Sequence, residues 1–537
     1  MAVTETPPET TDAASETGGP APRPQPTGLA AVLGTGDHKV IGRIYIVASL
    51  LFGALIIGLG EALAIESIEP ETNDIFPSDT VFQAFTLQRL GGIFLLALPL
   101  VIGVAMVVVP LQVGSRTIAF PRAAAASLWG WLLGSALLIA SYLANGGPGG
   151  GSAEGVDLWI ASMGLILVSL MVAAVCLATT VFALRTTGLS LGRLPLYAWS
   201  VLTASILWLV TLPVLFGLLV LAYVDHRHAG GIGPGDPGAL YGATTWMLRN
   251  PAIYIVAIPV LGFVGDVLAT TSGTRLKMRP VAQGAIAAFA TFSFGAFLVV
   301  ADEAALESPL VVVLGLVAVL PVLALAATVA DTFRTGSFKL NASVAYALGS
   351  FAVLLVAVLG GAVASIPGVL DAPDGGTISN NIAFMGVAHA AIIATVIAAL
   401  GGLTWWATKV GRQPAQEGAA VLAAVVLTVG GILTVVGDMV AGVIGEGAEL
   451  VADYTGGTTP LNVLTAVGIG IVILGVLVAL ASLRPLLRRS DDEVPADPWE
   501  GQSLEWLAPS PPPLANFDGE LAVVGSAEPL IDLREEK

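Results

Sequence analysis

The sequence predicts an all-α integral membrane protein, a bundle of twelve transmembrane helices. Its mean hydropathy is +0.86, and only 11% of its 537 residues are charged while 55% are hydrophobic. Water-soluble domains carry about 25% charged residues. A helix needs about 20 mostly apolar residues to cross a bilayer. Twelve such windows occur, near residues 41–65, 91–113, 123–144, 158–184, 196–223, 251–270, 281–301, 310–330, 342–366, 382–408, 419–443 and 461–483.

The basic residues support this count and predict an orientation. Lys and Arg accumulate in short cytoplasmic loops. With a cytoplasmic N-terminus, sixteen of the 22 basic residues fall on the cytoplasmic side, three lie in the tails, and only Arg89, Arg227 and Arg249 fall outside. We therefore expect a multi-pass protein of the cell membrane with both termini cytoplasmic. The net charge of −17 leaves no basic face for binding nucleic acid.

The composition divides the chain into three parts. Residues 1–35 are rich in Pro, Thr and Glu, and we expect a disordered N-terminal tail. Residues 36–490 form the predicted membrane domain, surrounded by membrane lipid. Residues 491–537 are acidic and proline-rich but contain Trp499, Trp506 and Phe517. These aromatic residues predict a cytoplasmic C-terminal tail that docks on the bundle or on a partner.

Metal-binding side chains are scarce. The single cysteine, Cys176, lies in an apolar segment, which excludes a disulfide scaffold and any Cys-rich zinc or iron–sulfur site. The chain has four histidines, His38, His226, His228 and His389. Of these, only His389 is predicted to lie inside the helix bundle.

Several segments together form a recognisable pattern, at residues 37–47, 110–122, 179–202, 212–215, 250–259, 405–412 and 497–517. In these segments the chain resembles subunit I of the heme-copper terminal oxidases, in particular cytochrome c oxidase subunit I of the actinobacterial type. The resemblance implies a twelve-helix bundle. It also implies subunit II-like and subunit III-like proteins, or another membrane redox complex, as partners.

The resemblance further implies a low-spin heme, a high-spin heme and a copper ion, held by six imidazoles. Most of these ligand positions carry other residues here. The low-spin heme positions fall on Gln88 and Ala391, and the high-spin position on His389, the only retained heme ligand. The copper positions fall on Asn250, Asp302 and Glu303.

Residues that support these cofactors in the family are replaced too. Tyr254 remains at its family position, but its copper-ligand partner does not. The proton-path positions carry Ala252, Thr117 and Leu325, the propionate-binding arginine pair aligns with Glu449 and Leu450, and the magnesium-site pair with Asn381 and Ile382. This joint loss predicts a degenerate member of the family.

We therefore expect no cofactor, or at most one heme on His389, which alternatively is a hydrogen-bonded remnant. Asp302 and Glu303 are candidate ligands for a hard cation such as Ca²⁺ or Mg²⁺, with solvated surface charge as the alternative. Asp266 and Asp438 lie in or near membrane segments. For these two, pairing between helices competes with a role in proton relay.

Three functions remain open. The leading hypothesis is a pseudoenzyme, a catalytically silent subunit I-like protein that serves as a structural or assembly subunit of a multisubunit complex of the respiratory chain or of another redox system. The second is a functional terminal oxidase that reduces oxygen and pumps protons. The third is an ion channel or carrier that uses the vacated heme space.

Overall fold

The computed structural model describes residues 28–69, 75–148, 150–228, 252–292, 308–336, 339–370, 381–448, 457–488 and 494–536. The chain forms two compact units, residues 1–35 and 36–537. The described part of the first unit contains one short helix, α1 (Leu29–Leu33). Everything that follows concerns the second unit.

The described residues of the second unit are helical, with no β-strand among them. The longer helices are α2 (His38–Glu66), α4 (Ser78–Gly91), the π-helix η1 (Gly92–Ala97), α5 (Leu98–Gln112), α6 (Pro121–Leu143), α7 (Ala153–Ala183), α8 (Leu196–Arg227), α10 (Ala252–Thr271), α11 (Arg279–Phe292), α13 (Pro309–Val317), α14 (Val319–Phe333), α15 (Ala342–Ala364), α16 (Ile382–Trp405), α18 (Glu417–Val443) and α19 (Thr459–Ser482). Short helices are α17 (Ala407–Val410), η6 (Arg484–Leu487), η7 (Leu504–Leu507) and α20 (Pro529–Glu535).

The predicted fold class is confirmed. Among the described residues, eleven helices are long and apolar enough to cross a membrane, with α4, η1 and α5 counted as one span and α13 with α14 as another. The remaining predicted window, 281–301, begins in α11 and continues beyond the described residues. The protein is therefore an integral membrane protein.

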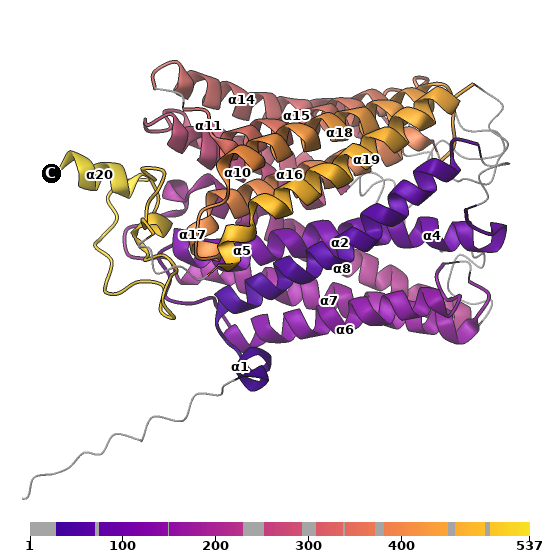
Figure 1. Ribbon diagram of the computed structural model, residues 1–537, viewed down its shortest axis with the longest axis horizontal. Helices are drawn as coiled ribbons and strands as arrows, with labels where there is room; N and C mark the ends of the chain where they lie inside the picture. Colours follow the sequence, from indigo (N-terminus) through magenta and orange to yellow (C-terminus); the bar gives the residue numbers. More distant parts are fainter. Residues whose placement is uncertain are drawn as a thin grey trace, which may run out of the picture. The chain divides into compact units, whose positions relative to one another are not determined.

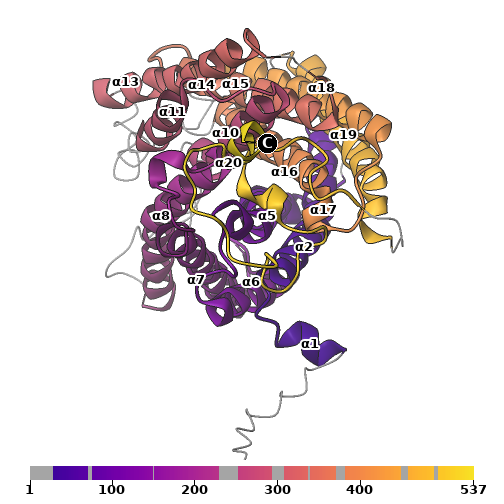
Figure 2. The same ribbon diagram turned by 90° about the vertical axis from the view of Figure 1, so that its left-hand side faces the viewer.

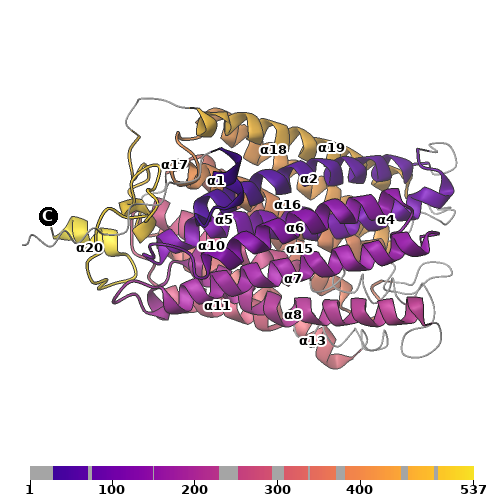
Figure 3. The ribbon, with the colours of Figure 1, turned by 90° about the horizontal axis from the view of Figure 1, so that it is seen from below.

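The membrane helices run alongside one another along the length of the bundle (Figures 1 and 3). Viewed from the end, α5 lies inside the ring formed by the other helices (Figure 2). The most apolar window of the span Thr80–Gln112 is 100% buried, whereas that of Pro309–Phe333 is only 28% buried. The outer helices can keep apolar side chains exposed because hydrocarbon, not water, surrounds a transmembrane bundle.

Polar residues define where several helices begin. Asp37, Ser152, Asn341 and Asn381 are the N-cap residues of α2, α7, α15 and α16, and each side chain accepts a backbone N–H from the first turn. Such caps satisfy amide groups that have no partner within the helix. They fix the ends of helices whose interiors are almost entirely apolar.

The C-terminal segment, residues 494–536, lies across one end of the bundle (Figures 1 and 2). The Trp499 ring stacks on Trp405 with centroids 5.1 Å apart, and its Nε1 donates to the Trp405 carbonyl at 2.9 Å. Trp506 packs edge-on against Trp405, and Phe517 is buried. This segment and neighbouring helices bury the rings of Trp405 and Trp406.

Arg275 and Arg279, which are both predicted to lie on the cytoplasmic side, form ion pairs with acidic residues of this segment. Arg275 forms ion pairs with Asp532 and Glu535 of α20, with N–O distances of 2.6 and 2.7 Å. Arg279 pairs with Glu528 at 2.6 Å. Loops far apart in the sequence therefore lie together at the end of the bundle that carries the C-terminal segment.

Candidate functional site

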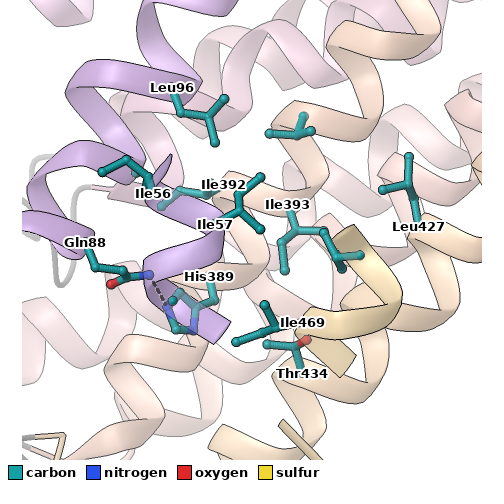
Figure 4. A pocket seen from close by; sticks show the side chains of 14 residues that line it. Ile56, Ile57, Gln88, Leu96, His389, Ile392, Ile393, Leu427, Thr434 and Ile469 are labelled. Carbon is teal, nitrogen blue, oxygen red and sulfur yellow. Dashed lines mark hydrogen bonds between the residues drawn. The ribbon is translucent and has the colours of Figure 1, made fainter. Parts of the chain in front are cut away.

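A small apolar cavity lies among α2, α4, η1, α16, α18 and α19 (Figure 4). It has a volume of about 60 Å³. Gln88, His389 and Thr434 contribute the polar side chains of the wall. The remaining lining residues are aliphatic or glycine: Ile56, Ile57, Gly60, Gly92, Leu96, Ile392, Ile393, Val396, Leu427, Ile469 and Val472.

His389 joins three helices through a hydrogen-bonded chain. Its Nδ1 lies 2.9 Å from Asp438 Oδ2 on α18. Asp438 is 2% exposed, and its Oδ1 accepts the Thr465 hydroxyl of α19 at 2.9 Å. A carboxylate only accepts hydrogen bonds, so the His389 proton is assigned to Nδ1. Each polar group in this chain therefore has a partner on a neighbouring helix.

Gln88 of α4 occupies the other side of the His389 ring. The two Nε2 atoms are 3.3 Å apart, and with the proton on Nδ1 the His389 Nε2 accepts from the Gln88 amide. Two glycines make room for this arrangement. A Cβ at Gly60 would lie 3.3 Å from Gln88 Nε2, and one at Gly386 would lie 2.8 Å from the Asp438 Cβ.

These residues do not fit a heme. Metal–nitrogen bonds are about 2 Å long, so two ligands on opposite sides of one ion lie about 4 Å apart. The Gln88 and His389 nitrogens are closer than that and are in direct hydrogen-bond contact. The resemblance placed these residues at two different hemes, whereas the structure brings both to one cavity. No basic side chain that would pair with heme propionates lines this cavity within the described part of the chain.

The other expected site residues are dispersed. Asn250, Asp302, Glu303, Glu449 and Leu450 lie outside the described residues. Ala391 is buried in α16, Ala252 begins α10, Leu325 is buried in α14, Thr117 lies between α5 and α6, Ile382 begins α16, and Tyr254 of α10 packs against Phe289 with ring centroids 4.8 Å apart.

The remaining metal-binding candidates are likewise separated. Asn381 caps α16 and donates to the Gly442 carbonyl at 2.7 Å. His38 binds the Met106 carbonyl and Asn516, and His226 lies near Asp157 on the surface. No cluster of three or more His, Cys, Asp or Glu side chains able to hold a metal occurs among the described residues.

Asp266 and Asp438 each bind groups on neighbouring helices. Asp266 of α10 accepts the backbone N–H groups of Leu196 at 2.7 Å and Tyr197 at 2.9 Å, at the start of α8. Gln112 donates to the same carboxylate at 3.2 Å. Sequence reasoning missed Gln112 and its second partner, Glu505, because a lone glutamine at a helix end gives no pairing signal.

A double-mutant cycle tests the contact between His389 and Asp438. Removing one member leaves a buried polar group unpaired, which costs about 1–3 kcal/mol. We expect His389→Gln and Asp438→Asn each to destabilise the purified protein, with a coupling energy above about 1 kcal/mol in denaturant unfolding. Thr434→Val is the matched control, because the Thr434 hydroxyl bonds only the Gly430 carbonyl of its own helix. Additive effects of the His389 and Asp438 substitutions would contradict this pairing.

Comparisons with known proteins agree with the fold. Residues 40–471 match the family described as Cytochrome C and Quinol oxidase polypeptide I. The chain is 26% identical to cytochrome c oxidase subunit 1 of Synechocystis sp., with 90% of each chain covered. It is 26% identical to cytochrome bo(3) ubiquinol oxidase subunit 1 of Buchnera aphidicola, covering 90% of this chain and 76% of that one.

A heme-copper terminal oxidase dimer solved by cryo-EM has the same fold, with a TM-score of 0.66 at 15% identity, covering 93% of this chain and 89% of that one. The all-helical bundle and the match over most of its membrane helices lead to one assignment. The chain belongs to the heme-copper oxidase subunit I family.

Proposed function

We propose that this protein is a catalytically silent member of its family that serves as a structural subunit of a membrane redox complex. The observation that carries this proposal is the engagement of both His389 ring nitrogens by protein side chains, Asp438 and Gln88. An imidazole needs a free nitrogen to ligate a metal. The only retained heme-ligand position is therefore used for packing between helices.

The identities of the other ligand positions support the same proposal. Gln88, Ala391 and Asn250 stand where the resemblance implies histidines. Losing one ligand would be compatible with altered chemistry. Losing most of them together leaves no means of holding two hemes and a copper ion.

The proposed partners are subunit II-like and subunit III-like proteins. One relative, from Aeropyrum pernix, is named heme-copper oxidase subunit I+III, and this chain covers 61% of it. That name joins two subunits in one protein. The outward-facing apolar side chains of the described helices are available to lipid and to such neighbours.

A functional terminal oxidase is the second candidate, because the names of the relatives favour it. It requires two hemes and a copper ion, whereas His389 is the only one of the implied ligand positions that carries a histidine. The two candidates therefore differ in a directly measurable property, the heme and copper content of the chain.

The test is to purify the full chain from its native membranes and measure heme and copper per chain. We expect no heme and no copper on this chain, and we expect subunit II-like and III-like proteins to copurify. His389→Ala is the control, because any heme lost in this variant was bound there. Two hemes and a copper ion per chain, with oxygen reduction, would contradict the proposal. So would purification without any partner.

We also propose that both termini face the cytoplasm. The support is the accumulation of basic loops at the end of the bundle that carries the C-terminal segment, as the positive-inside rule predicts. Ala515 and Ala144 are exposed, and the native Cys176 is buried.

Labelling of introduced cysteines with a membrane-impermeant maleimide tests this orientation. We expect Ala515→Cys to react only after the membrane is opened and Ala144→Cys to react in intact cells. The reverse pattern would show the opposite topology.

A further inference from the structure

The short helix η7 brings Glu505 into the end of the bundle. Its side chain is 1% exposed. Oε1 accepts from Gln112 Nε2 at 3.1 Å and from Trp406 Nε1 at 3.4 Å. Oε2 is buried and finds no hydrogen-bond donor among the described residues. The Ser503 hydroxyl also interacts with this carboxyl group. A buried carboxylate with an unsolvated oxygen is costly.

A second carboxylate lies across the Gln112 amide. Gln112 Nε2 donates to Asp266 Oδ2 as well as to Glu505. Asp266 also binds two backbone N–H groups at the start of α8, where the helix dipole favours negative charge. Asp266 therefore has donors that favour its anionic form, and an ionised Glu505 would place a second negative charge beside it.

The nearby cations have other partners. Lys409 Nζ donates to the Ala508 carbonyl at 2.5 Å and to Ser510 Oγ at 3.1 Å, and it lies 5.6 Å from the centre of the Trp506 ring. Glu505 and Asp497 both add negative charge to the surroundings of Lys409, although neither forms an ion pair with it in the described part of the chain.

Arg279 donates to the Leu194 carbonyl and is paired with Glu528 at 2.6 Å. Neither Lys409 nor Arg279 forms an ion pair with Glu505 in the described part of the chain. The charge of an ionised Glu505 would therefore lack a direct counter-ion.

We propose that Glu505 takes up a proton when the C-terminal segment docks on the bundle, so that this corner is a proton-binding site that makes docking depend on pH. A protonated Glu505 is neutral beside Asp266 and offers a donor. Gln112 Oε1, which is buried and has no partner among the described residues, is an acceptor available in the same corner. One proton on Glu505 thus removes the negative charge beside Asp266 and supplies a hydrogen-bond donor to a corner that has too few.

Burial raises the pKa of Glu505 from 4.5 to about 7, and the Asp266 charge adds to this rise. Between pH 4.5 and 7 the docked segment therefore holds a proton that a released segment has lost. Docking weakens as pH rises through this window, by up to about tenfold per unit for one proton. Burial lowers the pKa of Lys409 from 10.5 to about 8. Docking therefore strengthens again between pH 8 and 10.5, and it is weakest between pH 7 and 8.

A fluorine label tests this inference on the full chain in nanodiscs. Ala515→Cys carries a trifluoromethyl group, because Cys176 is buried and Ala515 is exposed next to the docked Asn516. We expect ¹⁹F NMR to show a released fraction that grows from pH 4.5 to 7. Glu505→Gln mimics the protonated acid, so it should dock at least as tightly as the wild type at pH 7.5, and it should lack the part of the pH dependence that the Glu505 proton contributes between pH 4.5 and 7.

Glu520→Gln is the matched control, because Glu520 is exposed in the same segment. His38, which contacts Asn516, is present in all variants. The difference in the pH dependence of docking between the wild type and Glu505→Gln therefore reports on Glu505 alone.

Infrared spectroscopy provides the second readout if the released state is too rare to observe. We expect a carboxylic acid carbonyl band at pH 6 that Glu505→Gln lacks. No such band, or weaker docking of Glu505→Gln at pH 7.5, would overturn the proposal.

Discussion

A polar side chain inside a transmembrane bundle must find its partner within the protein, because the surrounding hydrocarbon offers none. His389 meets this requirement through Asp438 and Gln88, and Asp438 in turn binds Thr465. Four helices are thereby tied together around one imidazole. The same constraint acts at the end of the bundle, where Asp266 satisfies the first amides of α8.

Apolar windows predicted the helices because a span is defined by its length and hydropathy. The same windows could not predict which side chains meet, since this depends on how each helix is rotated about its axis. Gln88 and His389 are therefore both recognisable as former ligand positions, yet their contact was unforeseen. The contact of Trp405 with the C-terminal segment was equally unforeseen, because a tryptophan pair at a helix end looks the same in sequence whether lipid headgroups or a C-terminal segment covers it.

Some positions that the resemblance assigns to cofactor ligands contribute contacts between the helices of the fold. The family fold persists at 15% identity to a solved oxidase, and among the described residues Gln88 and His389 bind each other while Ala391 is buried in α16. Buried polar groups also hold the C-terminal segment against the bundle. Lys409 of the bundle binds the Ala508 carbonyl of the segment, and Glu505 of the segment binds Gln112 of the bundle.

The central claim is that the two ring nitrogens of His389 bind protein side chains and that neither is an iron ligand. Nitrogen-15 NMR of histidine-labelled protein in bilayers tests it most directly, because the chain has only four histidines and His389→Gln identifies the resonance. The account predicts a diamagnetic His389 signal with its proton on Nδ1 and an unprotonated Nε2 that shows no metal coordination. A His389 resonance shifted or broadened by bound iron in the purified protein would contradict it.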